Sequence, residues 1–329
     1  MRSAFVTGAG GFLGMHLVAA LQADGVTVRA LAHSADSATR LRSAGVTVVE
    51  GDLGDTAALT RALTPASDVV FHVAADTTPW RRLRARQYTV NVDGTAAALA
   101  AAIAAGVPRF VHTSSVAVYG LVEDRPIDET LPRLGSGGPI HYAHTKALAE
   151  AQVLAADRAG RIGAAVLQPS HILGPGDRHN WSRLARLLAA RQLPGAPPGI
   201  GCFADVRAVA HAHVAAARDP RHGECWLLGG VEAPFAELVQ ALAVAIGVPA
   251  PRRRVPRALL TLNALFDEAR AAVSGREPAL TREGVALTCH RMRVDDRKAQ
   301  RELGYTHTPL DTLANDSVVW LRGEGLLPA

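Results

Sequence analysis

Residues 4–14 read "AFVTGAGGFLG", a short apolar run that passes directly into closely spaced glycines. Three glycines recur at intervals of three residues and lead into a segment with the periodicity of a helix. Glycines in this arrangement allow a tight turn and bring backbone N–H groups close to a pyrophosphate at the helix N-terminus. The stretch therefore predicts the strand, turn and helix that bind a dinucleotide, with contacts from Gly8, Gly11, Phe12, Leu13 and Gly14.

The alternation of strand and helix continues along the first half of the chain. Helix-like segments at 12–24, 81–105 and 142–159 separate short apolar runs. Those runs are 4–8, 26–32, 46–51, 68–74, 109–115 and 163–169. Continuous apolar strands that alternate with helices are typical of a parallel sheet covered on both faces. We therefore expect an α/β fold with a doubly wound parallel sheet of the Rossmann type.

Beyond Pro169 the pattern loosens into loops and helices, with too few strand-like runs for a second sheet. We expect a dinucleotide-binding domain at 1–169 and a smaller, mostly helical substrate-binding lobe at 170–329. Segments such as 203–218 are candidates to return to the first domain. The cleft between the two parts is the expected substrate site.

Composition and charge argue against several classes of protein. The 329 residues are 48% hydrophobic, but the longest apolar run (95–107) is too short and too rich in alanine to span a bilayer. With no leader-like pattern, we expect a cytoplasmic protein without a membrane partner. Three widely spaced cysteines and scattered histidines predict neither a disulfide framework nor a metal site. The basic run "PRRRVPR" (251–257) lacks interleaved aromatics, so we expect no nucleic-acid partner.

The end of the second expected strand bears on which nicotinamide cofactor is bound. An acidic residue at this point accepts hydrogen bonds from the ribose hydroxyls of NAD(H) and repels a 2′-phosphate. Here the strand ends with Ala32 and His33, and the nearby Ser34 and Arg40 could also meet a phosphate. We therefore expect NADP(H) in preference to NAD(H). Further cofactor contacts are expected from Asp52, Leu53, Ala74 and Ala75, at the ends of the third and fourth strands.

A tyrosine and a lysine lie four residues apart in "YAHTK" (142–146). Tyr142 and Lys146 would share one face of a helix, and Ser115 ends a strand at the carboxyl edge of the sheet, where such folds bind ligands. We expect the ammonium and the positive charge of the nicotinamide to lower the pKa of the phenol from about 10. A phenol so placed exchanges a proton with a carbonyl or alcohol oxygen while hydride moves at the adjacent carbon.

Seven motifs along almost the whole chain resemble those of the extended short-chain dehydrogenase/reductase family. They are "TGAGGFLG", "GDL", "HVAAD", "NVDGT", "HTSSVAVYG", "YAHTK" and "LQPSHILGPGD". The resemblance implies that Tyr142 is the acid/base, that Lys146 is its partner and holds the nicotinamide ribose, and that Ser115 contacts the substrate.

The same resemblance implies roles for residues outside this triad. Asn91 lies where the family keeps a structural or proton-relay asparagine, and Pro169 and Ser170 begin the segment that touches the nicotinamide amide. Asn91 is therefore grouped with the catalytic residues. The expected substrate contacts are Asp76, Ser115, Trp181 and Phe203.

Two reactions remain open for this triad. "DVRAVAHAHVAA" (205–216) is similar to a segment of dihydroflavonol-reductase and 3β-hydroxysteroid-dehydrogenase-like proteins, although Ala208 replaces an aspartate. "HVAADTTPW" (72–80) and "CHRMRVDDRKAQRELGY" (289–305) are similar to hopanoid-associated sugar epimerases. We favour the reduction of a ketone or aldehyde of a small-molecule metabolite, with epimerisation or dehydration of a nucleotide sugar as the alternative.

Two further observations complete these expectations. The loop "LPGAPPGIGCF" (193–203) is apolar, and a nucleotide-sugar diphosphate would have few basic partners, namely Arg178, Arg183, Arg186 and Arg207. The segments 81–105 and 142–159 have alanine-rich faces that could pack closely against a second copy. With the family resemblance, these faces lead us to expect a homodimer.

Overall fold

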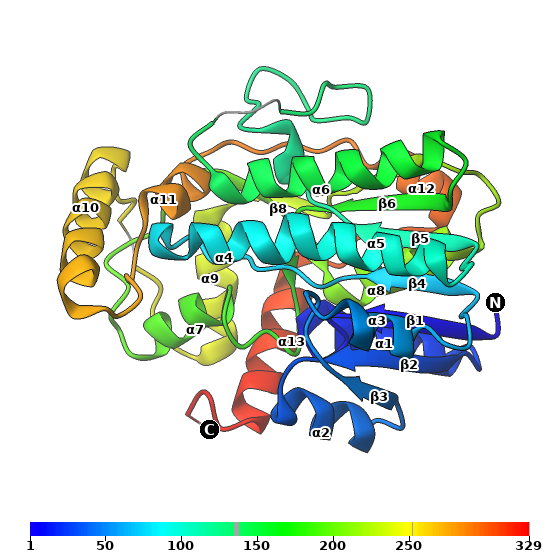
Figure 1. Ribbon diagram of the computed structural model, residues 1–329. Coiled ribbons are helices and arrows are strands. Elements are labelled where there is room, and N and C mark those ends of the chain that lie inside the picture. Colours follow the sequence, from blue (N-terminus) through cyan, green and yellow to red (C-terminus); the bar gives the residue numbers. More distant parts are fainter. Residues whose placement is uncertain (135–137, 252, 329) are drawn as a thin grey trace.

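A seven-stranded parallel sheet forms the centre of the molecule (Figure 1). The computed structural model describes residues 1–134, 138–251 and 253–328, so Arg252 of the basic run lies outside the described residues. The strand order is β3-β2-β1-β4-β5-β6-β9. The strands are β1 (Ser3–Thr7), β2 (Thr27–Ala32), β3 (Thr47–Glu50), β4 (Val69–His72), β5 (Arg109–Thr113), β6 (Gly163–Pro169) and β9 (Glu224–Leu228). The predicted doubly wound fold is confirmed.

Helices cover both faces of this sheet, as continuous apolar strands require. On one face lie α1 (Phe12–Ala23), α2 (Ala35–Ser43) and α8 (Val206–Arg218), whose buried side chains share one core cluster with the sheet. On the other face lie α3 (Thr56–Ala62), α5 (Gly94–Ala104) and α6 (His141–Arg158), around a second cluster. In Figure 1, α5 and α6 run side by side across the front of the sheet.

The helical segment expected at 81–105 changes its winding along its length. It begins with a 3₁₀ turn (Arg81–Leu83) and α4 (Arg84–Tyr88), and a π-helical turn (Thr89–Asp93) joins α4 to α5. Turns of π-helix are frequent at functional sites. The side chain of Asn91 starts from this turn and is buried.

The second half of the chain contains a small sheet of its own, so the expectation that it has too few strands for one was wrong. The sheet has the order β10-β8-β7. Its strands are β7 (His171–Leu173), β8 (Ile200–Asp205) and β10 (Val231–Pro234), and the first lies in a segment that we expected to be a loop. A three-residue strand is too short to show a periodic pattern, and only its neighbour reveals it.

Helices complete this lobe. They are α7 (Ser182–Ala189), α9 (Phe235–Ile246), α10 (Arg257–Ser274), α11 (Arg282–Thr288) and α13 (Leu310–Gly323), whereas α12 (Arg297–Leu303) packs against β9 and α8 of the large sheet. Among them, α7, α9 and α13 pack around a third core cluster. The segment 206–228 lies with the large sheet, because α8 packs against α1 and β9 pairs with β6.

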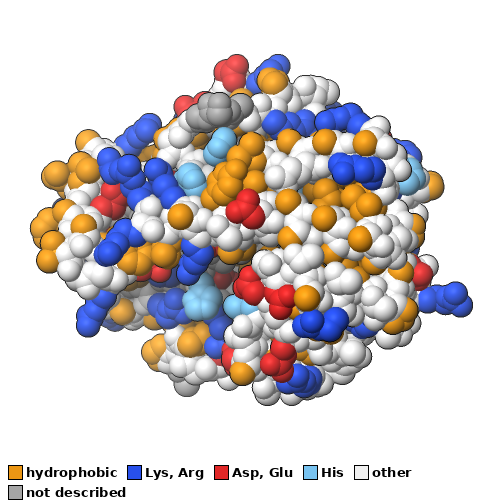
Figure 2. All heavy atoms as spheres, viewed as in Figure 1, with side chains coloured by type: hydrophobic (Ala, Val, Ile, Leu, Met, Phe, Trp, Pro, Cys, Tyr) orange, Lys and Arg blue, Asp and Glu red, His pale blue; other side chains and the backbone are white. Residues whose placement is uncertain are grey.

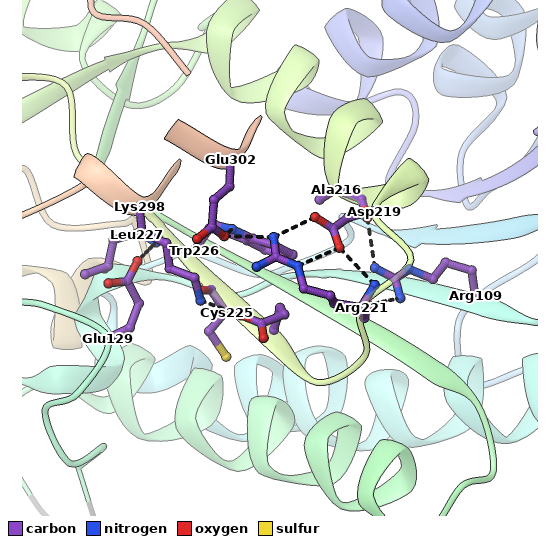
Figure 3. A network of polar contacts seen from close by, with 11 residues as sticks. Arg109, Glu129, Ala216, Asp219, Arg221, Cys225, Trp226, Leu227, Lys298 and Glu302 are labelled. Carbon is purple, nitrogen blue, oxygen red and sulfur yellow. Dashed lines mark hydrogen bonds and ion pairs between the residues drawn. The ribbon is translucent and has the colours of Figure 1, made fainter. Parts of the chain in front are cut away.

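The edge strand β9 is covered by side chains from three parts of the chain (Figure 3). Glu129 accepts a hydrogen bond from the Leu227 amide (3.0 Å), and Lys298 donates one to the Cys225 carbonyl (2.9 Å). Unpaired backbone groups on an edge strand invite pairing with another chain. These two contacts satisfy the Leu227 amide and the Cys225 carbonyl, so neither group is left free to pair with another chain.

No helix in the described part of the chain is long and apolar enough to cross a membrane. Within the same residues, no cluster of three or more histidine, cysteine or carboxylate side chains is arranged to hold a metal ion.

Candidate active site

The turn between β1 and α1 leaves no room for side chains at two of its glycines. Gly8 has a positive φ of 71°, and a Cβ built on it would lie 2.6 Å from the Ala74 amide nitrogen. A Cβ on Gly14 would lie 2.1 Å from the Gly8 carbonyl oxygen. Gly11 is less confined, since the nearest atom to its Cβ would be 3.2 Å away. Gly8 therefore brings β1 close to the end of β4, and Gly14 keeps α1 close to the turn.

The N-terminus of α1 is suited to bind an anion. Gly11 is its N-cap residue and has no side chain to accept from the first-turn N–H groups, and the first turn carries no acidic residue. Phe12 and Leu13 follow in that turn. Free N–H groups at the positive end of a helix dipole bind phosphate. The turn therefore fits the pyrophosphate of a dinucleotide.

The end of β2 presents hydrogen-bond donors and no carboxylate of its own. Ala32 is buried at the strand end, while His33 and Ser34 are exposed. Ser34 caps α2 by accepting a hydrogen bond from the Ser37 amide (3.3 Å). Arg40 extends back to the glycine turn and donates to the Gly10 carbonyl (3.2 Å), and it also pairs with Asp36 (2.6 Å). A guanidinium thus lies beside the position where the adenosine ribose of a dinucleotide would bind.

Two further predicted cofactor residues end β3. Asp52 is exposed, and its Oδ1 accepts a hydrogen bond from the Gly54 amide (2.9 Å), which fixes the turn after the strand. Leu53 packs against Gly94 at the start of α5. After β4, Ala74 is partly exposed and Ala75 is exposed. These positions line the carboxyl edge of the sheet next to the glycine turn.

Tyr142, Lys146 and Ser115 come together at the carboxyl end of β5. Ser115 begins a 3₁₀ turn (Val116–Tyr119), and its Oγ accepts from the Ala117 amide (3.1 Å). Tyr142 lies in the first turn of α6, within hydrogen-bonding reach of Ser115. Lys146 lies one turn later, is only 2% exposed, and donates from Nζ to the Thr113 carbonyl (2.6 Å). The three side chains therefore meet where a doubly wound sheet binds its ligand.

Burial dominates the protonation of this group, and the expected direction for the phenol was wrong in the protein alone. Burial raises the pKa of Tyr142 to about 12, and the hydrogen bond with Ser115 offsets only part of that rise. Burial also lowers the pKa of Lys146 to about 8, while the nearby Glu150 carboxylate acts in the opposite direction. Desolvation penalises each charged form. Tyr142 is therefore a protonated phenol at neutral pH.

Asn91 forms three hydrogen bonds that suit the structural role expected of it, while its grouping with the catalytic residues stays a prediction. Its Oδ1 accepts from the Asp76 amide (2.7 Å), and its Nδ2 donates to the Asp76 carbonyl (3.0 Å) and to Thr145 Oγ1 (3.0 Å). Thr145 in turn donates to the Tyr142 carbonyl (2.9 Å). The side-chain amide of Asn91 thus joins the loop after β4 to the first turns of α6, and both its oxygen and its nitrogen are engaged in these hydrogen bonds.

Pro169 and Ser170 lie at the end of β6, next to the small sheet. The Ser170 hydroxyl contacts two backbone carbonyls, those of Cys202 (2.9 Å) and Gly229. Ser170 therefore joins β6 to the segment after β9 and to β8.

Asp76, an expected substrate contact, accepts a hydrogen bond from the Thr78 amide (2.9 Å) and forms an ion pair with Arg86 (2.7 Å).

Phe203 does not face the cleft, contrary to expectation. Its side chain is fully buried, and it packs edge-on against Trp181 (6.0 Å between ring centroids) and Phe235 (5.5 Å). His171 contacts the same three rings. An aromatic residue of this size is as suitable for the core as for a substrate pocket, and the sequence could not separate the two. Trp181 is partly exposed and remains a predicted substrate contact.

Two buried carboxylates near the site were not predicted. Glu150, one turn beyond Lys146, accepts from Ser114 (2.5 Å), Gln168 and Arg133 (2.8 Å). The i, i+4, i+8 spacing of Tyr142, Lys146 and Glu150 could have indicated it.

The second missed carboxylate comes from the lobe. Glu283 on α11 pairs with Arg84 and accepts from the backbone amide of His141 (3.2 Å), the residue before Tyr142. The N-cap residue of α6, Ile140, has no side-chain acceptor of its own. Glu283 therefore caps α6 from 142 residues away along the chain, and no local pattern could have revealed it.

Comparison with known proteins agrees with this geometry. Residues 4–229 match the model of the NAD dependent epimerase/dehydratase family. A protein of Synechocystis sp. named "Putative dihydroflavonol 4-reductase" is 32% identical over 98% of this chain and 95% of its own length. The 4-hydroxy-2-methyl-3-oxo-4-farnesyl-3,4-dihydroquinoline-1-oxide ketoreductase of Stigmatella aurantiaca is 33% identical, with 98% of each chain covered. The crystal structure of the protein gox2253 superposes with a TM-score of 0.86 at 30% identity, over 100% of both chains.

Proposed function

The chain belongs to the NAD dependent epimerase/dehydratase family, the extended short-chain dehydrogenase/reductases, and on that basis we propose that it is an NADPH-dependent carbonyl reductase. Its substrate is a ketone or aldehyde of a small-molecule metabolite, reduced to the alcohol. The names of two relatives that match over nearly their whole length, both reductases, support this choice.

The observation that carries the proposal is the state of the arginines that a nucleotide sugar would need. Arg207 pairs with Asp205 (2.8 Å) and Asp316 (2.7 Å), Arg178 pairs with Glu324, and Arg186 donates to the Arg178 carbonyl (3.1 Å). A diphosphate would have to displace the buried Asp205 carboxylate from Arg207, and breaking such a pair is costly. The exposed Arg178–Glu324 pair would be displaced at little cost. The engagement of Arg207 therefore favours reduction over epimerisation.

The protonated state of Tyr142 also favours reduction of a carbonyl over oxidation of an alcohol. When bound, the nicotinamide supplies the hydride that reduces the carbonyl carbon. Tyr142 holds its proton at neutral pH and donates it to the carbonyl oxygen, to which the Ser115 hydroxyl gives a second hydrogen bond. Lys146 has donors beyond the one used on Thr113, and these are available to the ribose hydroxyls. The side chains thus stabilise the developing alkoxide and complete the alcohol.

The preference for NADPH rests on the surroundings of Ala32. No carboxylate ends β2 to accept from both ribose hydroxyls and repel a 2′-phosphate, while His33, Ser34 and Arg40 can donate to that phosphate. Asp36 lies beside Arg40 but is itself paired with it.

The test is the loss of NADPH or NADH absorbance against a panel of ketones and aldehydes, including lipophilic ones. We expect turnover of at least one carbonyl compound, faster with NADPH, and protein that purifies with little bound cofactor. Protein that retains NAD tightly and interconverts nucleotide sugars without net cofactor consumption would instead identify an epimerase.

A further inference from the structure

The helix α10 carries its apolar face outward. Of ten large hydrophobic side chains exposed in the described residues, five lie on this helix. They include Leu259 (48% exposed), Leu262 (63%), Phe266 (70%) and Val273 (92%), which recur at helical spacing and share one face. Only Ala264 and Ala271 are buried on α10. The usual orientation of an amphipathic helix is therefore reversed.

The acidic residues of α10 are held on its inner side. Asp267 accepts from the Leu280 amide (3.1 Å), and Glu268 accepts from the backbone amide (2.9 Å) and Nε (2.8 Å) of Arg282. These bonds fix the hairpin of α10 and α11 and turn both carboxylates away from the apolar face. The exposed Leu and Phe side chains thus have no acidic neighbour on the same face of the helix.

Arginines surround this face. Arg253, Arg254 and Arg257 lie at the start of the helix and Arg276 follows its end, and all four are exposed. Within residues 1–134, 138–251 and 253–328, none of these four forms an ion pair with a carboxylate. Arg270 is 64% exposed. Figure 2 shows the hydrophobic side chains at the left edge of the molecule, over α10, with basic side chains around them.

We propose that α10 docks on the surface of an anionic phospholipid membrane, with its Leu and Phe side chains inserted at the headgroup boundary and its arginines against the lipid phosphates. An apolar helix face with basic flanks is the pattern that binds such an interface. A symmetric contact with a second copy would bring the arginines of both copies together, which is unfavourable. This proposal departs from the expectation of no membrane partner, which rested on the lack of a spanning segment and of a leader, because a helix that lies on the membrane surface requires neither.

The docked face belongs to the same hairpin that contacts the active site. Glu277, between α10 and α11, accepts from Thr78 Oγ1 (3.3 Å), and Glu283 caps α6 next to Tyr142. Docking would therefore place the loop after β4 and the start of α6 on the side of the molecule that carries the membrane contact. Lipophilic substrates that partition into the bilayer would reach the site from there, a consequence that rests on the proposed reductase function.

The test is flotation of the full-length protein with vesicles, without substrate or cofactor, so the outcome does not depend on the proposed reaction. The vesicles are phosphatidylcholine alone or mixed with phosphatidylglycerol. We expect flotation with the mixed vesicles, weaker flotation with phosphatidylcholine alone, and a decrease at high salt. Leu262→Asp with Phe266→Asp should weaken binding by at least about tenfold, since burial of one such side chain is worth more than that factor.

The matched control is Val244→Asp with Val319→Asp, which changes two equally exposed apolar residues on α9 and α13 (69% and 58% exposed) and should bind as the wild type does. Thermal unfolding checks that all variants are folded. Three outcomes would overturn the proposal. They are no flotation of the wild type with mixed vesicles, equal flotation of the Leu262/Phe266 variant, and a wild-type dimer in light scattering that this variant alone dissociates.

Discussion

Tyr142 lies in the first turn of α6, where burial raises the pKa of its phenol and the nearby Ser115 offsets part of that rise. We predict that Tyr142→Phe lowers the turnover number by about 10²–10⁴-fold, the usual contribution of a positioned proton donor. The dissociation constant for NADPH should change little, because the ring remains in place. Cofactor titration by fluorescence and steady-state kinetics give the two quantities. Near-normal turnover in this variant would end the acid/base assignment.

Lys146 is expected to contribute to both cofactor binding and rate. Its pKa is lowered to about 8 by burial, so the ammonium is present below that pH and is lost as pH rises through it. NADPH affinity of the wild type should therefore weaken above about pH 8, and Lys146→Met should bind NADPH more weakly at all pH values without that step. Dissociation constants between pH 6 and 10 test this. A Lys146→Met variant with a lower turnover number but unchanged NADPH affinity would contradict the contact between Lys146 and the ribose.

Some residues could be assigned a role from short sequence motifs, whereas the roles of others depend on contacts with distant parts of the chain. The three glycines, Tyr142, Lys146 and Ser115 belong to short motifs, and the structure brings them to one edge of the sheet. The role of Phe203 was mistaken because packing alone decides which way an aromatic ring points. In the protein alone the pKa of Tyr142 is raised and not lowered, because burial is a property of the fold and not of the motif, and the lowering expected with the charged nicotinamide bound stays a prediction.

At the scale of elements, we expect the end of β2 to determine which cofactor is preferred. We predict that Ala32→Asp reverses the preference from NADPH to NADH, because a carboxylate there repels the 2′-phosphate and accepts from a 2′-hydroxyl. The ratio of the two dissociation constants should change by at least about tenfold, since like charges at close range cost more than 1.4 kcal/mol. Ala32 is buried, so retained NADH binding serves as the control for folding. An NADH preference in the wild type would refute the cofactor assignment.

The contact between α11 and α6 gives a second prediction at this scale. Glu283→Ala leaves the His141 amide and Arg84 without their acceptor. We expect a loss of about 1–3 kcal/mol in the free energy of unfolding and a lower turnover number, because the first turn of α6 carries Tyr142. Chemical denaturation and kinetics measure both. Glu324→Ala, which removes an exposed ion pair with Arg178, is the matched control and should cost less than about 1 kcal/mol. Equal effects of the two variants would count against a positioning role.

The elements themselves were predictable where they repeat a pattern and not where they depend on a neighbour. The six strands of the first half were expected within a few residues of their observed bounds, because each is an unbroken apolar run. The three-residue β7 and the small sheet escaped, since pairing with β8 defines them. The π-helical turn at Thr89–Asp93 also escaped, because the sequence there shows only a continuous helical segment.

At the scale of the whole molecule, we predict a homodimer formed through α5 and α6. Ala96, Ala100 and Ala104 are exposed on α5 one turn apart, and Ala151 and Ala155 are exposed on the adjacent α6. Small side chains allow two such helix pairs to approach closely as a four-helix bundle. Light scattering should give twice the chain mass of 34.5 kDa, and Ala100→Arg should restore the monomer mass. A wild-type mass near 34.5 kDa would contradict the dimer.

The most direct test of the account is the stoichiometry of cofactor and product in one reaction, for wild type and Tyr142→Phe. With a carbonyl substrate from the panel, the account predicts one NADPH oxidised for each alcohol formed by the wild type, and almost none of either in the variant. A substrate that is epimerised or dehydrated while the amount of reduced cofactor stays constant would contradict the proposal that this chain is a reductase.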